Sequence, residues 1–220
     1  MKTIATVTVW SQLHGLSTPK SDFDRFSIVK SELMEVLWKD EWHWSHKKNL
    51  EEDDTKYELL HFLKLATKGN GTILEILHSH LIDFSDEDWQ KIIDQKNIFL
   101  DKDAIYKSHI WYANSQLGQI ERWTVEIKRF RKALVAYLRT LYQGIQLLET
   151  WTVEYPLTGT FKDSLWSIKN GESFSFEDYF VVKEELGTQL KEKIEYAYKN
   201  SVLKKIDMNN VKEFFASLYK

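Results

Sequence analysis

The sequence predicts an α+β fold, in which a small mixed β-sheet with flanking helices is followed by a mainly helical domain. Three observations support this prediction. The first 30 residues contain two runs in which polar and apolar residues alternate, as strands require. Residues 101–150 instead repeat apolar residues at helical spacing almost without a break. Only two prolines and eight glycines occur in 220 residues, so few breaks interrupt the helical region.

The N-terminal region predicts a strand, a loop and a second strand. Residues 3–10 alternate Thr with aliphatic residues, which is typical of a strand and not of the apolar core of a signal peptide. Residues 22–30 begin with two acidic residues and then alternate in the same way. Between them, residues 11–21 contain Gly15, Pro19 and four Ser or Thr residues, a composition that favours turns.

Between residues 31 and 96, some segments predict a single type of secondary structure and others leave two types open. Residues 31–49 fit either a helix or an extended strand, and the alternative stays open. Residues 54–68 repeat apolar residues at helical spacing and predict a helix capped by its first or second residue. Residues 72–80 form a short apolar helix or strand. Residues 85–96 begin with Ser and carry Asp three positions later, which predicts a helix with a capping box.

The second half of the chain is expected to be almost entirely helical. Helices are predicted over residues 101–150, 175–200 and 207–219. Asp207 is expected to cap the last one, and proline and glycine interrupt residues 151–172. The change of pattern predicts two domains, a core at residues 1–100 and a mainly helical domain at residues 101–220 that completes a cleft.

The composition excludes several classes of site. The chain has no cysteine, which excludes disulfides, thiolate zinc sites and a cysteine nucleophile, and which favours a cytoplasmic protein. No apolar run approaches the roughly 20 residues that span a bilayer, so no membrane contact is expected. The formal net charge is -3, so nucleic-acid binding would need a local basic patch. Nine tryptophans indicate a core or a contact surface rich in aromatic side chains.

The candidate chemistry lies in residues 11–24, which read Ser-Gln-Leu-His-Gly-Leu-Ser-Thr-Pro-Lys-Ser-Asp-Phe-Asp. Asp22 and Asp24 are two positions apart on a predicted strand, so their side chains face the same way and can share a divalent cation. Ser11 and backbone amides at the end of the first strand can hold a phosphate chain. Taken alone, the Asp-x-Asp pair is better explained by carboxylates that cap or solvate the start of a strand, because so short a motif often matches by chance.

The longer string resembles a known family, the DNA-polymerase-β-like nucleotidyltransferases, in particular their RNA-repair-pathway branch, RlaP. The family motif reads Gly-Ser-x-Leu-x-Gly-x-x-Thr-Pro-x-Ser-Asp-x-Asp. This chain matches it at Ser11, Leu13, Gly15, Thr18, Pro19, Ser21, Asp22 and Asp24. The resemblance continues at residues 57–66, 70–77, 112–116, 132, 139 and 171–172. It therefore covers most of the chain.

The resemblance implies an enzyme that transfers a nucleoside monophosphate from an NTP, with ATP expected, to a hydroxyl group. The expected acceptor is RNA, and a protein acceptor is the alternative. Asp22 and Asp24 would hold Mg²⁺ together with a third carboxylate, for which Asp53 is the candidate and Asp54 the alternative. Ser11 would contact the β- and γ-phosphates. Two metal ions would activate the hydroxyl and stabilise the leaving pyrophosphate.

Two cations of the long helical region belong to the same resemblance. Lys132 and Arg139 are seven positions apart, so they share one face of a helix. The resemblance implies that they hold the triphosphate or the backbone of the acceptor. The pattern alone equally fits a solvated face shared with Arg129 and Arg131. Both interpretations stay open.

Four positions depart from the family pattern. Trp10 stands where the family has the Gly before the motif serine, Trp151 replaces a second Gly, Ala136 a His and Gly71 a Pro. A Gly lets the backbone approach phosphates, so the indole of Trp10 either turns into the core or fills the triphosphate pocket. The intact carboxylates favour an active enzyme. The alternative is an inactive nucleotidyltransferase-like protein that binds nucleotide, RNA or a protein partner.

Overall fold

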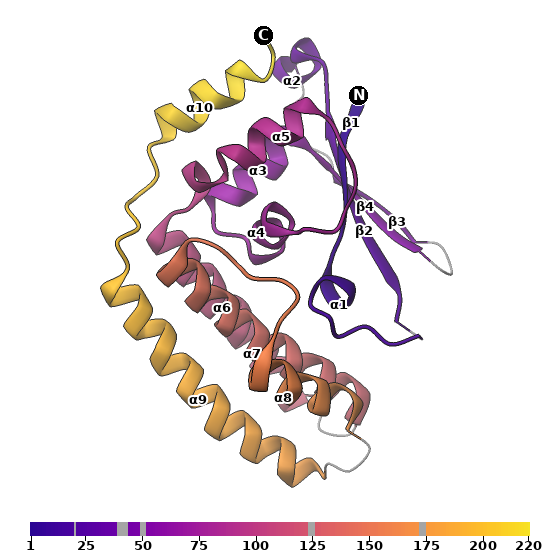
Figure 1. Ribbon diagram of the computed structural model, residues 1–220, viewed down its shortest axis with the longest axis vertical. Helices are drawn as coiled ribbons and strands as arrows, with labels where there is room; N and C mark the ends of the chain where they lie inside the picture. Colours follow the sequence, from indigo (N-terminus) through magenta and orange to yellow (C-terminus); the bar gives the residue numbers. More distant parts are fainter. Residues whose placement is uncertain (20, 39–43, 49–51, 123–125, 172–174) are drawn as a thin grey trace. The chain divides into compact units, whose positions relative to one another are not determined.

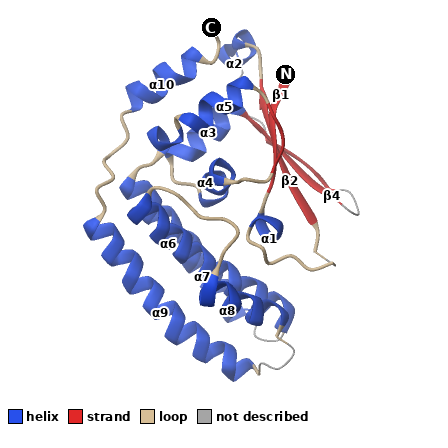
Figure 2. Ribbon diagram, in the orientation of Figure 1, coloured by secondary structure: helices blue, strands red, loops and turns tan. Residues whose placement is uncertain are grey.

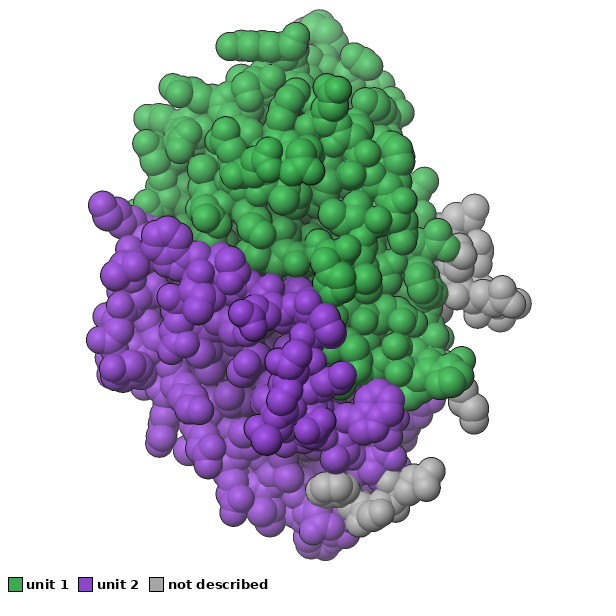
Figure 3. Space-filling view, in the orientation of Figure 1, with its two compact units in different colours: residues 1–101, 205–220 green, residues 102–204 purple. Residues whose placement is uncertain are grey.

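The computed structural model describes residues 1–19, 21–38, 44–48, 52–122, 126–171 and 175–220 (Figure 1). Of residues 37, 38, 44–48, 52, 53 and 176 it describes the backbone only. The chain forms two compact units, which Figure 3 distinguishes by colour. Unit 1 comprises residues 1–101 and 205–220, and unit 2 comprises residues 102–204.

Unit 1 is built on a five-stranded sheet with the strand order β3-β4-β2-β1-β5. The strands are β1 (Lys2–Thr8), β2 (Phe23–Lys30), β3 (Trp44–Lys48), β4 (Glu52–Glu58) and β5 (Ile82–Ser85). The pair β2 and β4 is parallel, whereas β1–β2, β1–β5 and β3–β4 are antiparallel. The sheet is therefore mixed, and the predicted α+β class is confirmed.

Within unit 1, helices cover one face of this sheet (Figure 2). Those of unit 1 are α1 (Trp10–Leu13), α2 (Leu33–Trp38), α3 (Leu59–Thr67), α4 (Gly71–His78), α5 (Glu87–Asp94), the 3₁₀ helix Lys96–Phe99 and α10 (Met208–Ser217). The buried side chains of α3 recur at helical spacing, at Leu59, Phe62, Leu63 and Ala66. They form the core with Ala5, Val7, Phe26 and Ile28 of the sheet, all of which are buried. This amphipathic pattern explains why α3 packs against the sheet.

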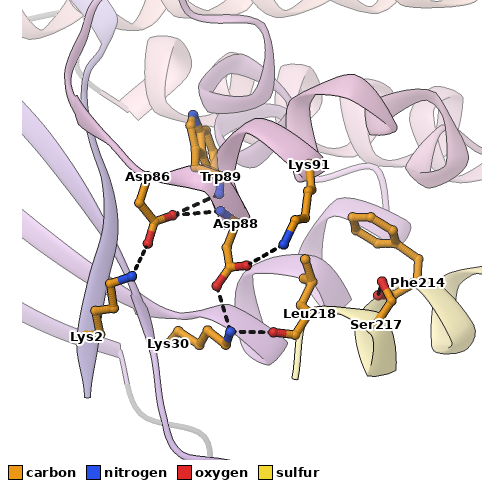
Figure 4. Close-up of polar contacts among 9 residues, drawn as sticks. All are labelled: Lys2, Lys30, Asp86, Asp88, Trp89, Lys91, Phe214, Ser217 and Leu218. Atoms are coloured by element: carbon orange, nitrogen blue, oxygen red, sulfur yellow. Dashed lines mark hydrogen bonds and ion pairs between the residues drawn. The ribbon is translucent and has the colours of Figure 1, made fainter. Parts of the chain in front are cut away.

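The last helix, α10, returns to unit 1. Lys30 of β2 donates hydrogen bonds to Asp88 of α5, at 2.6 Å, and to the carbonyl of Leu218 (Figure 4). The ring of Phe214 lies edge-on to that of Phe99, with 5.9 Å between centroids. The carboxylate of Asp207 caps α10, as the sequence predicts. Residues 205–220 therefore belong to the unit that contains the sheet.

In the described part of unit 2, all the regular secondary structure is helical. The unit contains α6 (Lys102–Arg122), α7 (Ile127–Thr150), α8 (Gly159–Asn170) and α9 (Phe176–Asn200). The helix α7 contacts all three others, and its buried residues lie on several sides of it. The predicted helical character of this region is confirmed. None of the described helices is long and apolar enough to cross a membrane.

The structure corrects the prediction for residues 54–68. These residues were expected to form one helix, but β4 extends to Glu58 and α3 begins only at Leu59. Glu58 caps this helix, because its Oε2 accepts hydrogen bonds from the amides of Leu60 and His61, at 2.8 and 3.2 Å. Hydrogen bonds to β2 satisfy the backbone of β4, so these residues form a strand although their own sequence carries only a weak strand signal.

Three neighbouring predictions are also resolved. The open segment 31–49 contains a helix, α2, and a strand, β3, within its described part. The short apolar segment 72–80 is a helix, α4. Ser85 was expected to cap the next helix, but it ends strand β5, and the cap of α5 is Asp86. The predicted first strand ends at Thr8, two residues early.

Candidate functional site

The parallel pairing of β2 and β4 decides which acidic residues share a face of the sheet. The Cα of Asp24 pairs with that of Asp53, and the Cα of Arg25 pairs with that of Asp54. Side chains alternate along a strand, so Asp24 and Asp53 belong to one face. The Ser27 hydroxyl donates to Asp54 Oδ1 at 3.2 Å, which places Asp54 on the opposite face. The side chain of Asp53 itself lies outside the described part of the chain.

The turn before β2 fixes where the acidic pair begins. The Thr18 amide donates to Ser21 Oγ at 2.8 Å, and the Ser21 amide donates back to the Thr18 carbonyl at 2.9 Å. Asp22 follows directly and is exposed, whereas Asp24, the second residue of β2, is half-buried. The Thr and Ser of the motif therefore shape the turn that leads into the carboxylates.

The turn that carries Ser11 lies beside the same strand. The Val9 amide donates to the Asp24 carbonyl at 3.2 Å, which ties the end of β1 to the start of β2. Ser11 then lies in the one-turn helix α1, and its carbonyl accepts from the Leu16 amide at 2.9 Å. Gly15 follows α1 with φ +68°, a left-handed conformation that glycine adopts readily.

Trp10 begins this turn with an unusual backbone. Its φ is +52°, in the left-handed region that most side chains avoid. Its amide donates to Glu75 Oε1 at 3.1 Å. The indole lies edge-on to the buried ring of Phe26, with 5.4 Å between centroids. This contact agrees with the alternative in which the indole turns towards the core.

Glu75 and His14 are two buried residues that sequence reasoning did not assign to the site. His14 Nε2 donates to Glu75 Oε1 at 2.7 Å, and the two side chains are 3% and 2% exposed. The missed signal was the single charge in the apolar helix Gly71–His78, because a charge in such a helix needs a buried partner. For His14 the sequence leaves two roles open, a contact with a phosphate or a base, or a hydrogen bond within the loop.

A row of aromatic rings continues along the face that carries Asp24. The ring of Phe26 stacks on that of Tyr57, at 5.7 Å, and Tyr57 stacks on His61, at 6.0 Å. Burial raises the pKa of Tyr57 above its usual value. Burial, together with nearby lysines, lowers the pKa of His61. The row therefore consists of neutral rings at physiological pH.

Lys132 and Arg139 belong to helix α7 of unit 2. Lys132 is exposed and Arg139 is half-buried. Of their neighbours, Arg129 pairs with Glu126 at 3.0 Å, and Arg131 donates to the Gly171 carbonyl and lies over the ring of Tyr179. The latter two arginines thus have local structural roles. The roles of Lys132 and Arg139 in a site stay predictions.

No group of three or more His, Asp or Glu residues that could hold a metal ion is formed by the described side chains. The expected third ligand, Asp53, lies outside that set. The described part of the site thus consists of Asp22, Asp24 and the turn around Ser11, all from unit 1.

The sheet, the motif turn and the acidic strand start define a nucleotidyltransferase-like protein. The model of one family, RlaP, described as the RNA repair pathway DNA polymerase beta family, matches residues 1–215, and the chain belongs to that family. The predicted membership is therefore confirmed. No curated protein matches the sequence.

The solved structures include a match to a nucleotidyltransferase-like protein from Exiguobacterium sibiricum 255-15. The two sequences are 12% identical, and the TM-score is 0.36. The match covers 87% of this chain and 70% of that one.

Proposed function

We propose that this protein is a Mg²⁺-dependent nucleotidyltransferase that transfers a nucleoside monophosphate from an NTP to a hydroxyl group, with RNA as the acceptor. One observation carries the proposal. The strand register sets Asp24 opposite Asp53, and Asp22 immediately precedes the same strand. Two carboxylates in sequence and a third across the sheet are the arrangement that a shared metal site needs.

The residues present suit Mg²⁺. Carboxylate oxygens are the hard ligands that this ion prefers, and it keeps water or phosphate oxygens in its remaining positions. The exposure of Asp22 leaves room for such further ligands. Asp22, Asp24 and Asp53 would hold the ion, which when bound would supply charge stabilisation to the phosphates and lower the pKa of the attacking hydroxyl.

The other residues of the site would bind and orient the substrate. The Ser11 hydroxyl and the amides of its turn would donate to phosphate oxygens, as backbone turns do in other phosphate sites. Lys132 and Arg139 would add positive charge for the triphosphate or the acceptor backbone. Since bound Mg²⁺ would lower the pKa of the acceptor hydroxyl, no side chain would have to act as a general base.

Calorimetry tests the binding step. We expect ATP or GTP to bind in the presence of Mg²⁺ and to lose this Mg²⁺-dependent binding in the double variant Asp22→Asn/Asp24→Asn. Asp53→Asn should share the loss. Asp54→Asn should bind as the unchanged protein does, because its carboxylate bonds to Ser27 on the opposite face. Equal effects at positions 53 and 54 would contradict the assignment.

Turnover is tested separately, with labelled NTP and RNA that carries free hydroxyl ends. Transfer of label to the RNA, together with release of pyrophosphate, is the expected result. Label on a protein instead of RNA would mean that the acceptor is a protein, whereas the proposed transfer reaction would stand. Unchanged NTP consumption after Asp22→Ala would refute the proposal.

A second candidate function is nucleotide, RNA or protein binding without turnover. Trp10 motivates it, because an indole stands where the family has Gly. If Trp10 blocks catalysis, Trp10→Gly should restore turnover or raise affinity for nucleotide and Mg²⁺. If Trp10→Gly changes neither, Trp10 is not the cause of an inactive site.

A further inference from the structure

Glu75 is held rigidly beneath the turn that carries Ser11. It lies in α4, whose first turn is capped by Asn70, with Oδ1 accepting from the Ile73 amide at 3.1 Å. The side chains of Ile73, Leu74, Ile76 and Leu77 around it are at most 1% exposed. A side chain on so buried a helix has little freedom to move.

One carboxylate oxygen of Glu75 holds both ends of this turn. Oε1 accepts from the Trp10 amide at 3.1 Å and from His14 Nε2 at 2.7 Å. Trp10 directly precedes Ser11, and His14 lies three residues after it. The two hydrogen bonds therefore bracket Ser11 and limit movement of its backbone.

Burying the Glu75 carboxylate costs free energy, which indicates that it has a role beyond packing. A buried carboxylate loses its hydration and needs hydrogen bonds in return, whereas an apolar residue would pack in α4 without that loss. Trp10 adds strain through its φ of +52°. The carboxylate holds the strained amide in the conformation that a Gly would adopt freely.

We propose that Glu75, supported by His14, is a positioning residue that keeps the Ser11 turn in the conformation that binds triphosphate. The proposal rests on the proposed function, because it assigns phosphate binding to that turn. Glu75 acts through the backbone of Trp10 and does not touch the substrate. Its effect is therefore on affinity for the nucleotide.

Three variants test this assignment. Glu75→Leu removes the acceptor oxygen, Glu75→Gln keeps it, and Ile73→Val weakens the packing of the same helix without touching the turn. Circular dichroism confirms that each variant is folded before use. If Glu75→Leu does not fold, Glu75→Met replaces it, because methionine also lacks the carboxylate oxygen that accepts from the Trp10 amide.

The first readout does not depend on nucleotide. Hydrogen exchange of the Trp10 amide, followed by NMR of protein labelled with ¹⁵N-tryptophan, reports its hydrogen bond directly. Exchange should be slow in the unchanged protein, in Glu75→Gln and in Ile73→Val, and at least about tenfold faster in Glu75→Leu. Equal exchange in all four proteins would overturn the positioning role, whether or not the protein binds NTP.

The second readout is the dissociation constant for Mg²⁺-ATP. Glu75→Leu should weaken binding about tenfold, which is the usual effect of losing a hydrogen bond to a charged group. Glu75→Gln and Ile73→Val should stay within about twofold of the unchanged protein. A loss in Ile73→Val as large as in Glu75→Leu would overturn the proposal, because general destabilisation would then explain both. If the protein without substitutions binds no nucleotide, the proposed function is refuted. The exchange rate of the Trp10 amide would then still test the positioning role of Glu75.

Discussion

Two tryptophans hold a left-handed backbone where the family pattern has glycine. Trp10 has φ +52° and Trp151, the residue after α7, has φ +65°. Glycine adopts this conformation freely, whereas other L-residues lose about 1–2 kcal/mol in it. Both positions thus have a backbone conformation that glycine adopts freely and tryptophan does not.

Trp151, in unit 2, offers a test of this backbone strain outside the turn that carries Ser11. We expect Trp151→Gly to be about 1 kcal/mol more stable than Trp151→Ala, because both remove the indole and only Ala stays strained. Trp111 is the control, since it is 71% exposed within α6. There Gly should be about 1 kcal/mol less stable than Ala. Urea denaturation of the four variants measures both differences, and the same sign at both positions would contradict the strain.

A buried histidine sets a pH dependence of stability. Burial lowers the pKa of His109 to about 4, against the opposing hydrogen bond to the Ile105 carbonyl. In the unfolded chain this side chain has its ordinary pKa of about 6.5 and therefore binds a proton more readily than in the folded protein. The free energy of unfolding consequently falls as the pH drops below about 6.5. Between pH 7 and pH 4 this single group should remove about 3 kcal/mol.

Denaturant unfolding at pH 7 and pH 5 checks this expectation. His109→Leu should flatten the pH dependence, whatever its effect on stability at pH 7. The same replacement at the exposed His80 should leave the slope unchanged. An unaltered slope in His109→Leu would exclude His109 as its source.

At the level of elements, two glycines in helices should respond to alanine with opposite signs. A Cβ at Gly187 of α9 would lie 2.8 Å from Cε1 and 2.9 Å from Oη of Tyr137, which belongs to α7. At Gly118 of α6 the nearest atom would be 4.0 Å away, at the end of the flexible Arg122 side chain. We expect Gly187→Ala to lose about 1–3 kcal/mol through overpacking and Gly118→Ala to gain about 0.5–1 kcal/mol. Thermal unfolding measures both, and stabilisation by Gly187→Ala would contradict the close packing.

The sequence predicts those elements best whose signal is local. The helical regions that contain α6, α7 and α9 and the two N-terminal strands carry strong periodicity, so their existence is predicted correctly. Helix α8 is not predicted, because it lies in the segment that proline and glycine interrupt. Strand β4, with the sequence Glu-Asp-Asp-Thr-Lys-Tyr-Glu, has no apolar alternation. It is a strand because β2 supplies its hydrogen-bond partners, and no local window contains that information. The exposed four-residue strand β5 was missed for the same reason.

In the candidate site, too, local features can be predicted from the sequence and long-range contacts cannot. The motif from Ser11 to Asp24 is contiguous and could be recognised in the sequence. The choice between Asp53 and Asp54 was left open, because it depends on the register between β2 and β4. The contact of Glu75 with Trp10 joins residues 65 positions apart, so it needs the folded chain.

At the scale of the whole molecule, the C-terminal helix closes unit 1 through contacts that no sequence pattern reveals. Lys30 and Leu218 are 188 positions apart, yet the ammonium group donates to that carbonyl. The same ammonium bonds to Asp88, and the two side chains are only 19% and 16% exposed. Burial raises the pKa of Asp88, but hydrogen bonds from Lys30 and Lys91 outweigh it and lower that pKa below its usual value. The carboxylate is therefore ionised, and Lys30 joins β2, α5 and α10 (Figure 4).

Lys30 should therefore matter far more than the second lysine beside Asp88. Lys30→Met keeps the aliphatic stem but removes the donor to Asp88 Oδ2 and to the Leu218 carbonyl, so it should lower the free energy of unfolding by about 2 kcal/mol. Lys91 lies 3.3 Å from Asp88 and is 55% exposed, and Lys91→Met should change stability by less than about 0.5 kcal/mol. Urea denaturation measures both values, and hydrogen exchange of the α10 amides should accelerate in Lys30→Met alone. Equal effects of the two variants would mean that α10 is held by its apolar contacts, such as Phe214 with Phe99, and not by the ammonium group.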